Sequence, residues 1–60
     1  MARRPFTVTS GPFEGQLYAL DLTDGEEITF RDSSGVVHVY AAHVFKDECS
    51  LYYIGVDPFG

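Results

Sequence analysis

Residues 26–40 read EEITFRDSSGVVHVY, and this stretch decides the fold class. In its first part Ile28 and Phe30 alternate with polar side chains, which is the two-residue period of a strand that buries one face. A run of turn-forming residues at 32–35 then ends in glycine, and a β-branched and aromatic run begins at Val36. The stretch therefore predicts a β-hairpin, with one strand over residues 26–31 and a second from 36 to about 44.

Three further β-rich segments flank this hairpin, at residues 6–9, about 16–22 and 51–56. The segment at 16–22 is apolar on both faces, which is typical of a central or strongly bent strand. Asp24-Gly25 predicts a second tight hairpin, because glycine readily adopts the positive φ that such turns require. Strands two, three and four are therefore expected to form an antiparallel meander.

The predicted fold class is all-β, a small five-stranded antiparallel SH3-like barrel, because curling the sheet buries one face and removes exposed edges. An open antiparallel sheet completed by dimerisation is the alternative. Residues 41–48 allow a short helical turn, since they begin with two alanines and end with acidic residues. The expected organisation is a flexible N-terminal arm over 1–5, one barrel domain over 6–56 and a C-terminal tail over 57–60.

The stretch TVTSGPFEG, residues 7–15, carries the most specific local pattern. Gly11 permits a conformation that other residues avoid, Pro12 stiffens the turn, and Phe13 projects from it. From Val8 to Gly15 the stretch resembles the KOW motif of SH3-like barrels in transcription elongation factors and ribosomal proteins. The resemblance implies a barrel fold and association with RNA or the ribosome. Glu14 stands where many members of that family carry a basic residue, and a generic Gly-Pro turn is the other interpretation.

The charge balance restricts the partners, because nine acidic residues against four basic ones give a formal net charge of −5. An acidic chain lacks the basic footprint of nucleic-acid-binding proteins and suits a basic partner better. If RNA bound the KOW-like loop, Phe13 would stack on a base while Arg3, Arg4 and Arg31 contacted phosphates. A third hypothesis is an acidic inhibitor of a nucleic-acid-binding enzyme, which would gather on one side the carboxylates of Asp21, Asp24, Glu26, Glu27, Asp47 and Glu48.

No motif predicts catalysis, a metal site or a cofactor. His38 and His43 are five residues apart and face opposite sides of a strand, so they are not expected to bind one metal. The single Cys49 has no disulfide partner in the chain, which favours a reducing compartment and a cytoplasmic location. No apolar run is long enough to span a membrane, and residues 1–5 precede no apolar segment, so no secretory signal is expected.

Aromatic residues make up 15% of the chain, and exposed tyrosine is enriched at interaction surfaces. Residues 51–56 are apolar on both faces, and the sequence places no charge between Glu48 and Asp57. We expect this segment to be an unprotected edge strand, with one face in the barrel and the other on another protein or another copy, most simply a homo-oligomer. The candidate interaction residues are Phe13, Tyr18, Arg31, Tyr52 and Tyr53.

Overall fold

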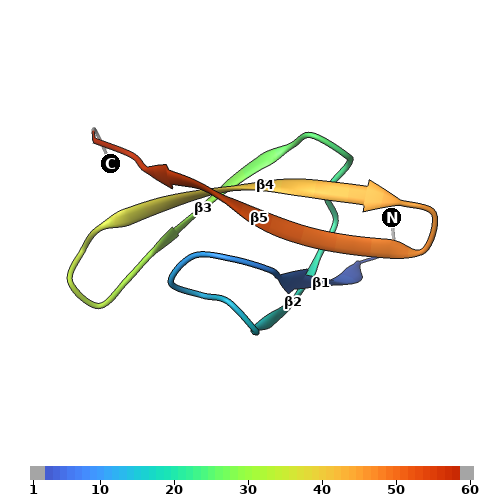
Figure 1. The fold of residues 1–60 in the computed structure, drawn as a ribbon, viewed down its shortest axis with the longest axis horizontal. Helices are drawn as coiled ribbons and strands as arrows, with labels where there is room; N and C mark the ends of the chain where they lie inside the picture. The colour runs from blue at the N-terminus through green and yellow to red at the C-terminus, as the bar shows by residue number, and fades with distance from the viewer. Residues whose placement is uncertain (1–2, 59–60) are drawn as a thin grey trace.

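The structure is a computed structural model that describes residues 3–58. This part of the chain is all-β and contains no helix (Figure 1). Its five strands are β1 (Arg4–Val8), β2 (Leu17–Leu20), β3 (Glu27–Arg31), β4 (Val37–Phe45) and β5 (Glu48–Val56).

The helical turn expected at residues 41–48 is wrong. β4 continues to Phe45, a two-residue turn at Lys46 and Asp47 follows, and β5 begins at Glu48. Lys46 has a φ of 55°, which a tight hairpin turn requires. The strand conformation is favoured here because every residue from Ala41 to Phe45 has a partner in β5. A single helical turn would leave most of its backbone N–H and C=O groups unpaired.

The strands form one sheet in the order β2-β1-β5-β4-β3, curled into a partly open barrel (Figure 1). The pairs β1–β2, β3–β4 and β4–β5 are antiparallel, but β1 and β5 pair parallel, so the predicted purely antiparallel sheet is wrong on this point. The parallel pairing of β1 with β5 follows from the directions of the strands. When successive strands alternate in direction, the first and fifth run the same way, and curling the sheet brings them together.

The expected meander is confirmed for β3 and β4 but wrong for β2 and β3, which lie at opposite edges of the sheet. Residues 21–26 carry the chain from one edge to the other. Gly25 keeps the positive φ expected of it, at 89°, yet it forms a corner rather than a hairpin. The corner is fixed to β4, since the Gly25 N–H donates to the Ala42 carbonyl and the Ala42 N–H donates to the Glu26 carbonyl.

The expectation that the last strand is an edge is also wrong, because β5 lies in the centre of the sheet between β1 and β4. The true edges are β2, which is only four residues long, and β3, which carries the charged side chains of Glu27 and Arg31. Short strands and outward charges are the usual protection of exposed edges. The apolar outer face of β5 is therefore not explained by its place in the sheet.

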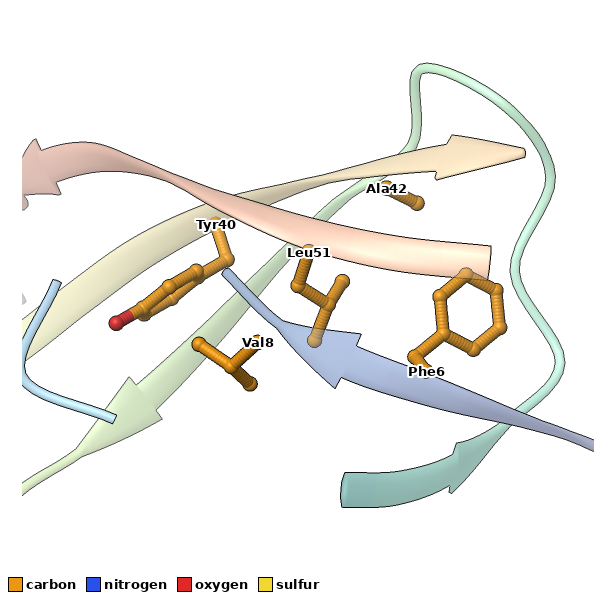
Figure 2. Close-up of a cluster of buried hydrophobic side chains, with 5 residues drawn as sticks. All are labelled: Phe6, Val8, Tyr40, Ala42 and Leu51. Atoms are coloured by element: carbon orange, nitrogen blue, oxygen red, sulfur yellow. The ribbon is translucent and has the colours of Figure 1, made fainter. Parts of the chain in front are cut away.

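The core lies on the concave side of the curled sheet (Figure 2). Five side chains from three adjacent strands form it, each no more than 1% exposed: Phe6, Val8, Tyr40, Ala42 and Leu51. The parallel pairing aligns Val8 with Leu51, and the antiparallel pairing aligns Leu51 with Ala42. Burying Phe6, Val8 and Leu51 contributes about 1.5–3 kcal/mol each, so the packing of β1, β5 and β4 stabilises the fold strongly.

Near the two ends of the described residues the chain joins the sheet through β1 and through a backbone hydrogen bond of Asp57. β1 begins at Arg4, two residues before the expected start of the first strand, while residues 1–2 of the expected arm lie outside the described residues. At the other end, the Asp57 N–H donates to the Val37 carbonyl. Residues 59–60 of the expected tail lie outside the described part of the chain.

Candidate functional site

A cluster of aromatic rings occupies the concave side between the open edges of β2 and β3. Tyr18 of β2 stacks on Phe30 of β3 with ring centroids 4.8 Å apart, so side chains bridge the two edges where no backbone pairing does. Phe13 packs against Phe30 at 5.6 Å, and Tyr40 packs against Tyr53 at 5.2 Å. Offset and tilted rings at these separations attract one another. The cluster therefore closes the curled sheet and belongs to the core.

The Gly-Pro-Phe loop between β1 and β2 packs directly on this cluster. The Tyr40 hydroxyl donates to the Ser10 carbonyl at 3.0 Å and accepts the Phe13 N–H at 3.2 Å. Gly11 has a φ of 80°, and a side chain there would meet the Tyr40 hydroxyl and the Tyr53 ring. Glycine is therefore required at this position by both conformation and space.

A buried histidine links this loop region to the β3–β4 turn. The Nε2 of His38 lies 2.7 Å from a carboxylate oxygen of Asp32, and its Nδ1 lies 3.0 Å from the Tyr53 hydroxyl. An ionised carboxylate only accepts hydrogen bonds, so Nε2 carries the proton and, in the neutral ring, Nδ1 accepts from Tyr53. The other Asp32 oxygen accepts the N–H groups of Ser34 and Val36. One carboxylate thus organises the turn and orients the ring.

The pKa of Asp32 is lowered from its ordinary value, chiefly by the hydrogen bond from His38 and then by the Val36 N–H. Both donors favour the ionised form of the carboxyl group. In the hydrogen-bonded series of side chains Asp32–His38–Tyr53, each nitrogen and oxygen has a partner. His38 is only 7% exposed. This arrangement suits a structural role better than proton transfer to a substrate, because the ring presents no free nitrogen.

A second carboxylate fastens the opposite end of β3. Asp24 accepts the Val44 N–H at 2.9 Å and lies 3.7 Å from the Nδ1 of His43. Beside it, the side chain of Glu26 accepts both the N–H and the hydroxyl of Thr23. These bonds, the backbone one first, hold the pKa of Glu26 below its ordinary value. The carboxylates of Asp24 and Glu26 therefore have structural partners.

The convex side of the sheet also carries apolar side chains, and two of them, Tyr52 and Ile54, are about half exposed. We call Val37, Val39, Ala41, Tyr52 and Ile54 on this face the convex patch, in which Tyr52 and Ile54 are exposed, Val39 is half-buried, and Val37 and Ala41 are buried. Tyr52 is 47% exposed and Ile54 is 50% exposed, although β5 is a central strand. Ala41, paired with both Glu27 and Tyr52, keeps only 3% exposure beneath its larger neighbours. A sheet face that meets water normally carries polar side chains at such positions.

A β-bulge shapes this patch. Tyr40 pairs with Tyr53 and Val39 pairs with Gly55, so Ile54 is the extra residue on β5. Bulges bend a strand and increase its twist. Ile54 consequently stands out from the sheet beside Gly55, which offers no side chain to cover it. Four more large apolar side chains of the described residues are exposed: Leu17 at 66%, Phe45 at 58%, Val56 at 53% and Val36 at 37%.

The structure separates the candidate interaction residues. Phe13, Tyr18 and Tyr53 come together in the concave aromatic cluster, where each is half-buried. Tyr52 lies on the opposite, convex face, and the adjacent tyrosines face opposite ways as a strand requires. Arg31 is exposed at the end of β3, where it pairs in register with Val37 of the convex patch. Of the candidate residues, Tyr52 and Arg31 therefore share a surface.

Tyr53 is a predicted interaction residue, and neither His38 nor Asp32 is predicted as a site residue, whereas the structure joins all three by hydrogen bonds. One usable signal was present, since His38 shares a strand face with Tyr40 and so points inward. Its partner Asp32 is six residues away and is found only when the hairpin register is known. The outward turn of Ile54 depends on the bulge, for which the sequence offers only the neighbouring Gly55.

Other features of the described chain offer little to a ligand. An open depression on the outer surface is lined by residues of β1 and of the β4–β5 hairpin: Pro5, Thr7, Thr9, Asp47, Glu48, Cys49 and Ser50. Within residues 3–58 no group of three or more His, Cys, Asp or Glu side chains is placed to hold a metal ion. The same range contains no helix long and apolar enough to cross a membrane. No family model, curated protein or solved structure matches the chain.

Proposed function

We propose that this chain is a small non-catalytic binding module with an SH3-like barrel architecture, and that it acts through protein–protein interaction or self-association. The observation that carries the proposal is the convex patch. Tyr52 and Ile54 are each about half exposed on a central strand that bears no charge from Cys49 to Val56. A contiguous apolar surface with a polar rim is typical of an interface.

The rim supports this interpretation. Across β3 the patch is bordered by Glu27, Thr29 and Arg31, and towards β1 it is bordered by Ser50 of β5 and by its register partner Thr7 of β1. Tyr52 is the natural anchor, because tyrosine offers a large rigid area and a hydroxyl group that can bind a partner. The face thus combines a central aromatic residue, aliphatic neighbours and a charged margin.

The KOW-like RNA-binding alternative draws less support. Phe13, the ring that would stack on a base, is half-buried against Phe30 and His38. Of the arginines that would contact phosphates, Arg4 begins β1 and Arg31 ends β3, and these two strand ends lie on opposite sides of the sheet in Figure 1. Binding to phosphates gains from several cations on one surface. The acidic-inhibitor alternative rests on carboxylates of which Asp24 and Glu26 already have structural partners.

The proposal is tested by sedimentation of the chain labelled at its N-terminus, alone over a concentration series and in clarified extract of its native cells. We expect the parent to sediment faster than a 6.7 kDa monomer in at least one of these conditions. Tyr52→Lys is expected to remain monomeric, because a charge at the centre of an apolar interface is costly to bury. Ser33→Lys, which adds the same charge in the exposed β3–β4 turn, is the matched control and is expected to follow the parent. A parent that is monomeric in both conditions contradicts the proposal.

A further inference from the structure

We infer that the occupant of the convex patch is a second copy of this chain, packed face to face about a two-fold axis. The inference rests on the proposed function and names the partner. It starts from the order of side chains on the outer face of β3, where Glu27 precedes Thr29 and Arg31 follows it. Glu27 is in register with Ala41 and Arg31 with Val37, so one end of the patch carries a negative charge and the other end a positive one.

This layout is complementary to itself. In a two-fold dimer the same patch serves on both subunits. Suppose that the axis lies between the two sheets, perpendicular to the strands, and passes Thr29. β3 of the second copy then lies opposite β3 of the first and runs antiparallel to it. Arg31 of each copy then faces Glu27 of the other, which forms two equivalent ion pairs about 13 Å apart at the rise of a strand.

Sheet geometry fits the same arrangement. Packed sheets lie about 10 Å apart, with strands inclined by about 30°. Arginine and glutamate together are long enough to meet across that gap at the margin, while Tyr52 and Ile54 fill the middle. Ile54 projects at the bulge, and Gly55 beside it leaves room for a side chain of the other copy.

The charges favour a second copy over a basic partner. The whole chain has a formal net charge of −5, but the patch with its β3 margin carries one acidic and one basic side chain and is locally neutral. Salt at physiological concentration screens charges beyond about 8 Å, so local pairing outweighs the repulsion between distant acidic groups. A standard interface buries about 800 Å² per partner. That is about a fifth of this chain's 4134 Å² of accessible surface, so the charged margin has to take part along with the apolar centre.

Charge reversal tests the inference with purified protein at low salt, by sedimentation equilibrium. Glu27→Arg and Arg31→Glu each place like charges opposite one another in both pairs, and each is expected to raise the Kd of dimerisation at least about tenfold. The double variant Glu27→Arg/Arg31→Glu restores opposite charges and is expected within about threefold of the parent. An equimolar mixture of the two single variants is expected to form a heterodimer, because both pairs are again attractive.

The direction of the Glu27→Arg effect separates this model from general charge repulsion. The substitution changes the net charge from −5 to −3, so repulsion between whole molecules predicts tighter association, whereas the reciprocal pairs predict weaker association. Both residues are exposed, and thermal unfolding of each variant confirms that it folds. Monomeric parent protein at every concentration, or single variants that dimerise as well as the parent, overturns the inference. If purified protein is monomeric and yet sediments faster in extract, the proposed function stands and only the second copy is wrong.

Discussion

Gly11 shows how one residue ties the β1–β2 loop to the core. Its φ of 80° places it where side chains are rarely found, and a methyl group would lie 2.6 Å from the Cγ of Tyr53. Gly15 at the other end of the loop has a φ of 90° but nothing within 4 Å. The two glycines therefore share a conformational requirement and differ in the space around them.

This difference predicts unequal costs for the same substitution. Gly15→Ala is expected to lower the free energy of unfolding by about 1–2 kcal/mol, from the left-handed conformation alone. Gly11→Ala adds a collision with two core rings and is expected to cost at least about 2 kcal/mol more. Urea unfolding of both variants measures the difference. Equal losses would show that Gly11 is needed for its φ alone and that the loop does not press on the core.

The carboxylate of Asp32 predicts how stability depends on pH. Its pKa is lowered in the folded chain by the hydrogen bonds from His38 and from the β3–β4 turn. A carboxylate whose pKa is lowered on folding stabilises the folded state. This stabilisation is complete above the ordinary pKa of 3.8, and it is lost as the pH falls from there through the lower pKa of the folded state.

Asp32→Asn removes the titrating group while keeping an oxygen that accepts hydrogen bonds. The variant is expected to have a lower free energy of unfolding than the parent at pH 7. This difference in stability is expected to decrease as the pH falls below about 4. Thermal melts between pH 2 and pH 7 follow both proteins. A gap of constant size across that range would mean that the ionised form of Asp32 makes no special contribution.

At the scale of elements, the sequence predicts well what neighbouring residues decide. The alternation of Ile28 and Phe30, the turn at 32–35 and the run from Val36 correctly predict the β3–β4 hairpin, because its register depends on local contacts. The opposite orientations of Tyr52 and Tyr53 follow from the same two-residue period.

Pairings between distant strands could not be predicted in this way. Asp24-Gly25 has the chemistry of a hairpin turn, yet it forms a corner, because β1 pairs with β5 and leaves β2 and β3 at opposite edges. That pairing is selected by the burial of Phe6 and Val8 against Leu51, more than forty residues away along the chain. The apolar outer face of β5 was visible in the sequence, but its central position was not.

At the scale of the whole molecule, a 60-residue chain has little stability to spare, since a domain of this size buries only about 60% of its unfolded surface. The fold uses its concave face fully: the five core residues and the aromatic rings that bridge β2 and β3 all lie there. On the convex patch Val37 and Ala41 are buried, whereas Tyr52 and Ile54 stay about half exposed. We propose that this second face serves association.

Site-specific photo-cross-linking tests that claim most directly. A benzophenone side chain placed at position 52 lies on the convex patch, and one placed at position 14 lies in the exposed β1–β2 loop beside the concave aromatic cluster. On illumination in native cells, position 52 is expected to form a discrete adduct, at twice the mass of the chain if the partner is a second copy, while position 14 forms none. Absence of any adduct at position 52, or the same adducts at both positions, would contradict the claim.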